Sequence, residues 1–233
     1  MPEKPVPPPV PPDDADEVMA IVAHEIRAPL TVIAGYLEIL GRPLDDASRE
    51  RALAESLRAV GRIETLVDDL AHVASAGEWF DPKSVAPVSM SSLAAEVAAS
   101  FGHVSSHVIE VVYESPGIVN GNESRLRQAL ANLVANAVVH APAGGRITLA
   151  VSPREGAVVI SVEDEGPGIP ADARERVFER FERLGTGSTG QPGTGLGLYI
   201  VREIVRAHGG SVRAEEGECG RGTRMVVELP AAP

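Results

Sequence analysis

The sequence predicts an α-helical hairpin that forms a dimeric four-helix bundle, followed by an α+β two-layer sandwich domain. Three observations predict this fold class. Apolar residues recur at three- and four-residue steps between residues 13 and 76, which is the spacing of amphipathic helices. Gly and Pro then interrupt the pattern, and after them short β-type runs mix with helical ones. The length of 233 residues also exceeds that of a typical single domain.

The first helix is expected over residues 13–40, after a tail (residues 1–12) whose seven prolines are typical of an extended, disordered segment. Aspartates favour the positive end of this helix, and its apolar residues form one stripe. The stripe consists of Val18, Ile21, Val22, Ile26, Leu30, Ile33, Leu37 and Leu40. Pro29 lies inside the helix and should bend it, because proline has no amide hydrogen to donate. Gly41-Arg42-Pro43 ends the helix.

A second helix over residues 46–76 completes an antiparallel hairpin. Its apolar stripe consists of Leu53, Leu57, Val60, Ile63, Val67, Leu70 and Ala74. One hairpin leaves such a stripe partly uncovered, whereas two hairpins from two chains bury it as a four-helix bundle. We therefore predict a homodimer. The predicted boundaries are residues 13–79 for the hairpin domain, 80–90 for a linker and 91–233 for the second domain.

The second domain mixes helices and strands. Helices are expected over residues 92–101, 123–140 and 196–207, and strands over residues 108–114, 146–152, 157–163, 211–216 and 223–229. Elements segregated in this way indicate helices packed on one sheet. Aromatic residues make up only 3% of the chain, so both cores must consist of aliphatic side chains.

The composition excludes some classes of function. The net charge of −12 argues against nucleic acid or an anionic membrane surface as the main partner, because binding phosphates requires a basic field. The single cysteine, Cys219, cannot form an intrachain disulfide, which fits a reducing compartment. No run reaches the ~20 apolar residues of a transmembrane helix, and no secretory signal is visible. We therefore expect a soluble, cytoplasmic protein.

His24 and Glu25, on the first helix, form a candidate nucleophile and base. A neutral imidazole can attack phosphorus through one ring nitrogen, and a carboxylate can accept the proton from the other. Adjacent helical residues project about 100° apart, so contact between these two side chains is not automatic. A lone histidine of this kind is more often a polar residue on a helix surface.

Asn132 and Asn136 lie four residues apart and therefore share one face of the predicted helix over residues 123–140. Two carboxamides that point the same way can offer oxygen to a hard cation and nitrogen to phosphate oxygens. Asparagine is a mediocre helix former, so two of them within an otherwise apolar helix require a reason.

Two glycine-rich turns follow. The glycines of Asp164-Glu165-Gly166-Pro167-Gly168 permit a flat ligand to approach, and Asp164 offers an acceptor for an exocyclic amine. The run Gly193-Thr194-Gly195-Leu196-Gly197-Leu198 opens a helix, whose first amides can bind phosphate. Each turn alone is weak evidence, and the second is neither a P-loop nor a Rossmann fingerprint.

The order and spacing of these motifs resemble those of the sensor histidine kinases. The asparagine helix, the Asp-x-Gly-x-Gly turn, the run Val177-Phe178-Glu179-Arg180-Phe181 and the last glycine run resemble the N, G1, F and G2 boxes of the family's ATP-binding domain. The run Ala23-His24-Glu25-Ile26-Arg27-Ala28-Pro29-Leu30-Thr31 resembles its H box. The resemblance extends from about residue 14 to residue 230, which is nearly the whole chain.

The resemblance implies an ATP-dependent protein-histidine kinase of a two-component system. His24 would take the γ-phosphoryl group of ATP, with Glu25 as general base, and pass it to an aspartate of a response regulator. Asn136 would hold Mg²⁺ and Asn132 would contact phosphate, while Asp164 would accept from the adenine amino group. The further nucleotide-binding residues that the resemblance implies are His140, Gly166, Gly168, Phe178, Arg180, Gly193, Thr194, Gly195, Leu196, Gly197, Leu198 and Thr223.

Three departures from the family pattern modify these expectations. Four residues after the histidine the family often has Thr or Asn, which aligns a water for dephosphorylating the regulator, so Ala28 predicts weak or absent phosphatase activity. The basic residue usual three positions after the Mg²⁺ asparagine is Val139 here. A phosphate contact is then either missing or supplied by Arg180 or another residue of the loop before the last glycine run. Finally, we expect no sensor domain before the hairpin.

Two other functions remain open at this stage. A dimeric scaffold with a degenerate nucleotide domain would dock regulators without catalysis; Val139 favours it, whereas the intact glycine turns and both asparagines oppose it. Gyrase-type ATPases and serine kinases of the anti-sigma type share the pocket but lack a histidine hairpin, so residues 23–31 argue against them. The sequence also leaves open whether transfer runs within one subunit or across the dimer.

Overall fold

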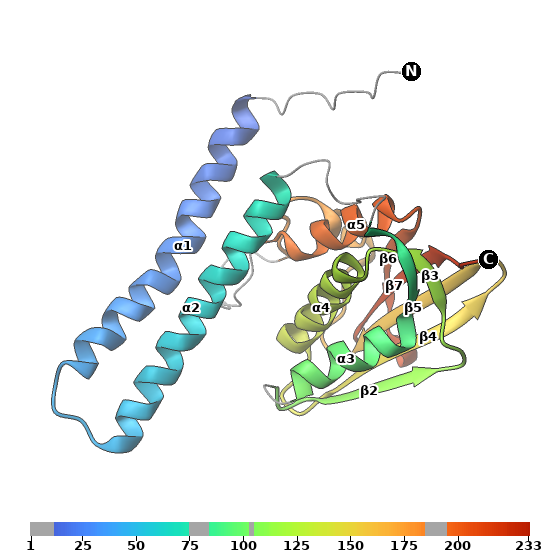
Figure 1. Ribbon diagram of the computed structural model, residues 1–233. Helices are drawn as coiled ribbons and strands as arrows, with labels where there is room; N and C mark the ends of the chain where they lie inside the picture. The colour runs from blue at the N-terminus through green and yellow to red at the C-terminus, as the bar shows by residue number, and fades with distance from the viewer. Residues whose placement is uncertain (1–11, 75–83, 103–104, 185–194) are drawn as a thin grey trace. The chain divides into compact units, whose positions relative to one another are not determined.

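The structure, a computed structural model, describes residues 12–74, 84–102, 105–184 and 195–233. The chain divides into two compact units between Leu70 and Ala71. The first unit is built from two long helices, and all strands of the described residues belong to the second (Figure 1).

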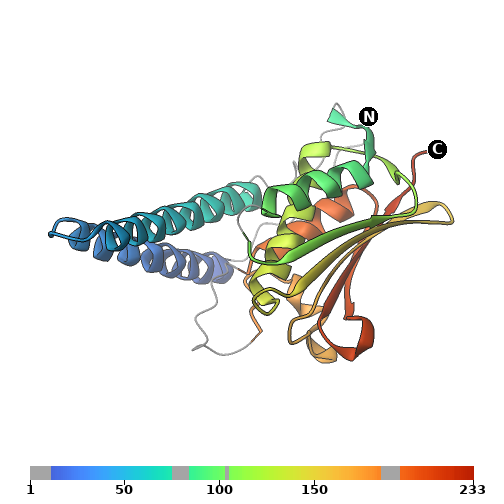
Figure 2. The ribbon, with the colours of Figure 1, turned by 90° about the horizontal axis from the view of Figure 1, so that it is seen from below.

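The first unit is the predicted antiparallel hairpin. Helix α1 spans Pro12–Leu40 and helix α2 spans Asp46–Ala74, and the two lie side by side in both views (Figures 1 and 2). Helix α1 continues through Pro29, and two residues later the hydroxyl of Thr31 donates to the carbonyl oxygen of Arg27 at 2.9 Å. The helix therefore contains a proline without ending there.

Asp45 caps the start of α2. Its carboxylate accepts hydrogen bonds from the backbone N–H and the hydroxyl of Ser48, at 2.7 and 3.0 Å. These bonds hold the pKa of Asp45 below its usual value of 3.8. The cap satisfies donors that a helix start leaves without an intrahelical partner, which explains why α2 begins where the sequence predicts.

The apolar stripe of the hairpin is largely exposed in a single chain. On α2, Ala52, Ala59 and Leu66 are buried. Of its predicted stripe, Leu53, Leu57, Val60 and Val67 are 40–70% exposed, whereas Ile63 and Leu70 are half-buried. The large apolar side chains that remain exposed on both helices are Leu30, Val32, Leu37, Ile39, Leu53, Leu57, Val60 and Val67. No helix of the described residues is long and apolar enough to cross a membrane.

The second unit is a five-stranded sheet with helices on one face, the predicted two-layer α+β sandwich (Figure 2). The strand order is β2-β4-β5-β7-β6, and all neighbours are antiparallel except β2 and β4. The strands span Val108–Tyr113 (β2), Arg146–Arg154 (β4), Ala157–Asp164 (β5), Ser211–Glu216 (β6) and Thr223–Pro230 (β7). The helices are α3 (Met90–Gly102), α4 (Glu123–His140) and α5 (Gly197–Ala207).

Two short strands were missed by the sequence analysis. Strand β1 (Ala86–Ser89) pairs with β3 (Ile118–Gly121) in an antiparallel two-stranded sheet. Residues 86–90, predicted as part of a linker, therefore belong to the folded second unit. Strands of four residues are too short for alternation to be visible, and Pro87 reads as a turn residue although an edge strand tolerates it.

The core of the second unit is aliphatic, as the low aromatic content predicts. Five aliphatic residues spaced at three- and four-residue steps along α4 are all buried: Leu126, Leu130, Leu133, Val134 and Ala137. On β4, buried Ile147, Leu149 and Val151 alternate with half-exposed residues. This period of two is that of a strand with one face on the core, so α4 packs against a regular apolar surface.

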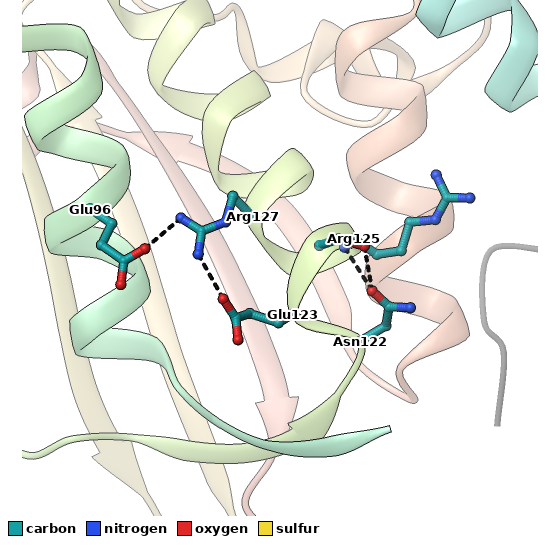
Figure 3. A network of polar contacts seen from close by, with 6 residues as sticks. Glu96, Asn122, Glu123, Arg125 and Arg127 are labelled. Atoms are coloured by element: carbon teal, nitrogen blue, oxygen red, sulfur yellow. Dashed lines mark hydrogen bonds and ion pairs between the residues drawn. The ribbon is translucent and has the colours of Figure 1, made fainter. Parts of the chain in front are cut away.

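The start of α4 is fixed by polar contacts (Figure 3). Asn122 is its N-cap, and its side-chain oxygen accepts from the backbone N–H of Arg125 at 3.1 Å. One turn later, Arg127 forms ion pairs of 2.7 Å with both Glu96 of α3 and Glu123. These charges are exposed and screened by solvent, so the cap contributes more to positioning than the ion pairs do.

Candidate active site

The predicted nucleophile lies on the hairpin. His24 is part of α1, and its side chain lies outside the described part of the structure. The side chain of Glu25 is half-buried. Pro29 cannot donate the usual helical hydrogen bond to the carbonyl of Glu25, because it has no amide hydrogen. The structure therefore places the backbone of both predicted residues on one helix, next to a locally weakened hydrogen-bond ladder.

Asp164 is a buried carboxylate at the end of β5, only 4% exposed. Its Oδ1 accepts from the backbone N–H of Gly166 at 2.7 Å, and it lies opposite Thr223, which begins β7 and is also buried. Burial raises the pKa of Asp164 above its usual 3.8, more than backbone hydrogen bonds from Gly166 and Thr223 lower it. A carboxylate can only accept hydrogen bonds, so a ligand that donates an N–H would offset part of this burial cost.

The turn after Asp164 can be formed only with glycine at two positions. A Cβ at Gly166 would lie 2.6 Å from Oδ1 of Asp164 and 2.7 Å from the carbonyl oxygen of His140. Gly168 has a φ of 79°, and its Cβ would lie 3.0 Å from the carbonyl oxygen of Gly222. The turn is therefore packed between the last residue of α4 and the turn before β7.

Asn132 connects α4 to the start of α5. Its Nδ2 donates to the carbonyl oxygen of Gly197 at 3.2 Å, and both asparagines, Asn132 and Asn136, are half-buried. The first amides of α5 have no acceptor within the helix, which makes its start suitable for an anion. Helix α4 therefore passes the start of α5 at Asn132 and the Asp164 turn at His140, with Asn136 between them.

The segment with the two phenylalanines joins the last glycine run. Phe178 ends a short 3₁₀ helix (Arg176–Phe178) and is buried. The backbone N–H of Phe181 donates to the carbonyl oxygen of Gly195 at 3.0 Å. Phe181 has a φ of 62°, a left-handed conformation that is uncommon for such a residue, and Gly195 packs against its backbone with no room for a Cβ. The two segments are therefore held together directly before α5.

Arg180 lies over the ring of Tyr199 in the first turn of α5. Its guanidinium carbon is 4.7 Å from the ring centroid, and its Nη2 donates to the phenol oxygen at 2.6 Å. Arg202 approaches the same ring, at 5.6 Å. Sequence reasoning missed Tyr199, because nothing in the sequence shows that an arginine 19 residues earlier lies on it. The contact places positive charge at the end of α5 that favours anions.

The structure does not bring all of the predicted nucleotide-binding residues together. Gly193 and Thr194 lie outside the described residues, while Leu196 is buried and Leu198 half-buried at the start of α5. His140 and Val139 are exposed at the end of α4. A shallow hollow of about 370 Å³, lined by residues 155–157, 209–211 and 228–230, lies at the other end of β5 from Asp164 and contains none of the predicted residues.

His208 is buried, although a histidine at the end of a helix is ordinarily exposed. Its imidazole is 9% exposed, because it ends α5 and turns back against the start of α4. Nδ1 lies 2.7 Å from the carbonyl oxygen of Ile204, and Nε2 accepts from the backbone N–H of Asn122 at 3.0 Å. Two glycines after a histidine at a helix end were the available signal, since they allow the chain to turn closely there.

His208 should make the stability of the fold depend on pH. Burial lowers its pKa below the usual 6.5, so below pH 6.5 the unfolded chain binds a proton that the folded chain does not. The stabilisation that the neutral His208 ring gives the fold is complete above pH 6.5. As the pH falls below this value, the free energy of unfolding decreases by at most about 1.4 kcal/mol per pH unit. Urea unfolding at pH 7.5 and 5.5 should show a smaller pH effect for His208→Gln than for wild type; an equal effect would contradict the assignment.

Two protein-family models match the chain, one in each unit. Residues 14–78 match the His Kinase A (phospho-acceptor) domain. Residues 121–233 match the family described as histidine kinase-, DNA gyrase B-, and HSP90-like ATPase. The second family alone would also admit gyrase-type ATPases, but the match of the hairpin to a phospho-acceptor domain does not.

Known proteins that resemble this chain are sensor kinases. The probable sensor histidine kinase TcrY of Mycobacterium tuberculosis H37Rv is 38% identical over 219 residues, which are 92% of this chain and 45% of TcrY. The solved mycobacterial sensor histidine kinase MprB is 33% identical with a TM-score of 0.57, over 64% of this chain and 99% of MprB. Histidine kinase ThkA, solved in complex with response regulator protein TrrA, is 26% identical with a TM-score of 0.70. The match covers 93% of this chain and 62% of the ThkA chain.

The chain spans less than half the length of the curated relatives it matches. The matches nevertheless reach both of its units and agree on one family. The chain belongs to the histidine kinases.

Proposed function

We propose that this chain is the catalytic part of an ATP-dependent protein-histidine kinase of a two-component system. His24 accepts the γ-phosphoryl group of ATP and later passes it to an aspartate of a response regulator. Glu25 acts as the general base that takes the proton from the imidazole. The need for ATP is the reason to expect the reaction in the cytoplasm. The membership of the chain in the histidine kinases supports this activity.

One observation carries the proposal for the nucleotide site. Helix α4 contacts the start of α5 through Asn132 and the Asp164 turn through the carbonyl of His140. An acceptor for a base and a start of a helix for phosphates therefore lie along the same helix. ATP would supply a hydrogen-bonding partner at both places. Its adenine amino group would donate to buried Asp164, and its phosphates would accept from the amides that begin α5.

The residues present also fit a magnesium ion. The carboxamide oxygen of Asn136, between the two ends of the proposed site, is a hard ligand of the kind that Mg²⁺ accepts, and Asn132 contacts phosphate. When bound, the ion supplies positive charge that offsets the charge of the transferred phosphoryl group. Arg180, held at the first turn of α5 by Tyr199, adds positive charge in place of the basic residue that Val139 replaces.

We further propose that the hairpin forms a homodimer through its exposed apolar stripe. Leu57 is 70% exposed in the single chain, and neighbours along α2 are exposed as well. Four-helix packing with a second hairpin would cover these side chains and gain about 1.5–3 kcal/mol for each large one that is fully buried. A response regulator would then bind to this helical unit, where His24 lies.

Replacing Leu57 with Asp should dissociate the dimer, because it would bury an unpaired charge in the bundle. We expect the dimer to weaken by about 100-fold or more. Light scattering coupled to size-exclusion chromatography over a range of concentrations measures this. Arg62→Asp, which introduces the same residue at an exposed polar position of α2, is the control and should remain dimeric. A wild-type monomer, or a Leu57→Asp dimer as stable as wild type, would contradict the proposal.

Restoring a polar side chain at position 28 should create phosphatase activity. Ala28 follows His24 by one helical turn and has no side-chain atom that can orient a water molecule. We expect wild type to leave the lifetime of a phosphorylated receiver domain unchanged, and Ala28→Thr to shorten it by about tenfold. Ala28→Val, which has nearly the same shape without the hydroxyl, is the matched control. Acceleration by wild type would refute our reading of Ala28.

Incubation with γ-labelled ATP and Mg²⁺ tests the proposed activity. We expect covalent label that survives base and is released by acid, as a phosphorus–nitrogen bond requires, and no label without Mg²⁺. A label that survives acid but is released by base would indicate a phosphorylated hydroxyl instead. A protein that binds ATP without becoming labelled would favour the non-catalytic scaffold.

A further inference from the structure

Helices α4 and α5 run antiparallel, and a hydrogen bond links α4 to each end of α5. At the proposed phosphate end, Asn132 Nδ2 donates to the carbonyl oxygen of Gly197 at 3.2 Å. At the other end, the backbone N–H of Asn122 donates to Nε2 of His208 at 3.0 Å. We call these two hydrogen bonds joints, and the Asn122–His208 bond is the distal joint. They are separated by about 15 Å along α4. One joint therefore belongs to the proposed site, and the other lies far from it.

The hydrogen bond between Asn122 and His208 requires one particular tautomer of the His208 imidazole. Because a backbone N–H can only donate, Nε2 must be the unprotonated acceptor, and Nδ1 carries the proton that it shares with the carbonyl oxygen of Ile204 at 2.7 Å. A buried imidazole with both nitrogens occupied has little freedom to rotate. The ring thus links the last turn of α5 to the first residue of α4.

The packing around this ring leaves no room for adjustment. A Cβ at Gly121 would lie 2.7 Å from Cδ2 of His208 and 2.8 Å from Cδ1 of Leu126. Only a glycine lets the backbone before α4 approach the imidazole so closely. The contact therefore depends on a residue of each segment: a histidine at the end of α5 and a glycine before the start of α4.

The side chain of Asn122 makes three hydrogen bonds. Its Oδ1 accepts from the backbone N–H of Arg125 (Figure 3) and from the hydroxyl of Ser124, at 3.1 and 2.7 Å. Its Nδ2 donates to the hydroxyl of Ser84 at 2.6 Å. Ser84 lies just before β1, so the N-cap of α4 also contacts the start of this strand's segment within the second unit. The N-cap bond to Arg125 holds Asn122 at the start of α4, with its backbone N–H toward His208.

We propose that His208 and Asn122 are positioning residues for the nucleotide: their hydrogen bond sets the angle between α4 and α5, and hence the distance between the two asparagines of α4 and the first amides of α5. This inference rests on the proposed function. Without the distal joint, the helices would be able to pivot about the Asn132–Gly197 bond. ATP binding would then have to restore the angle, and its affinity would fall.

Two replacements of His208 separate positioning from a local role at the end of α5. In His208→Gln, the amide group extends to the position of Nε2 and can accept from Asn122, but the bond to Ile204 is lost. In His208→Asn, the shorter amide replaces Nδ1 and can donate to Ile204, but the bond to Asn122 is lost. Each variant thus keeps one of the two hydrogen bonds and loses the other.

The experiment measures, on the full chain, the affinity for a non-hydrolysable ATP analogue by calorimetry and the autophosphorylation rate at saturating ATP. We expect His208→Asn to lose about tenfold in affinity and His208→Gln to stay near wild type. The rate at saturating ATP should change less than the affinity in both variants. Equal affinities in the two variants, or the reverse order, would overturn the proposal, and the reverse order would assign His208 to the end of α5 alone.

Controls separate this result from other failures. Ser124→Ala removes a hydrogen bond to the same Asn122 side chain without touching the His208 joint, and it should bind ATP like wild type. If His208→Asn does not fold, Gly121→Ala displaces the imidazole from the opposite side and should also weaken ATP binding; unchanged affinity there would overturn the proposal. A wild-type protein that binds no ATP would instead refute the proposed function on which this inference rests.

Discussion

Replacing His24 with glutamine should abolish phosphorylation of the chain, lowering the label from γ-labelled ATP by about 1,000-fold or more. Glutamine retains a polar side chain of similar length but offers no nucleophilic ring nitrogen. Because His24 lies on the hairpin and Asp164 in the other unit, the affinity for ATP should be unchanged. Label incorporation and calorimetric ATP binding on the same preparations measure both quantities.

The matched control is His72→Gln, which removes another histidine of the same hairpin. It should be labelled like wild type. Labelling that persists in His24→Gln would show that a different residue is the acceptor. Loss of label in both variants would point to a general effect on the hairpin rather than to a nucleophile.

Replacing Asp164 with asparagine should lower the affinity for ATP by about 30-fold, because the carboxylate proposed to accept a hydrogen bond from the adenine amino group becomes an amide. The variant nearly preserves the shape of the side chain and can still accept from the backbone N–H of Gly166 through its oxygen. Its NH₂ group, however, would face the adenine amino group, and two donors repel each other. Since burial raises the pKa of the wild-type carboxyl, the loss of ATP affinity on acidification should begin at a higher pH than an ordinary aspartate would cause.

The purine base itself provides a sharper comparison. Wild type should bind ATP more tightly than the triphosphate of purine riboside, which lacks the amino group, whereas Asp164→Asn should bind the two alike. Asp172→Asn, which replaces an exposed aspartate of the short 3₁₀ helix Ala171–Ala173 after the glycine turn, controls for the loss of one negative charge. An Asp164→Asn protein that still prefers ATP would contradict the role of this carboxylate.

Helix α4 illustrates what the sequence reveals. Its inward residues and the shared face of Asn132 and Asn136 follow from a period of 3.6 residues, and the structure confirms the buried stripe. The Asp164 turn was predictable for a similar reason, since glycines at its two tight positions mark a backbone that other segments approach closely. Features of this kind depend on residues that are close together in the sequence, so the sequence predicts them.

His208, Tyr199 and the pair β1–β3 show what the sequence does not reveal. The role of His208 depends on Asn122, 86 residues earlier, and Tyr199 matters because Arg180 lies on its ring. Such contacts arise only when the sheet brings distant segments together. Similarly, apolar periodicity predicts a stripe on α2 but not what covers it, and in the single chain Leu57 remains exposed. The pKa shift of Asp164 likewise comes from burial, which no local pattern encodes.

The most direct test of the central claim is to locate the phosphoryl group after the chain reacts with ATP and Mg²⁺. Fragmentation mass spectrometry at neutral pH, which preserves phosphorus–nitrogen bonds, assigns the modified residue. We predict a single phosphoryl group on the peptide that contains His24, on the histidine itself. A phosphoryl group on a serine, a threonine or another histidine, or ATP hydrolysis that leaves the chain unmodified, would contradict the account.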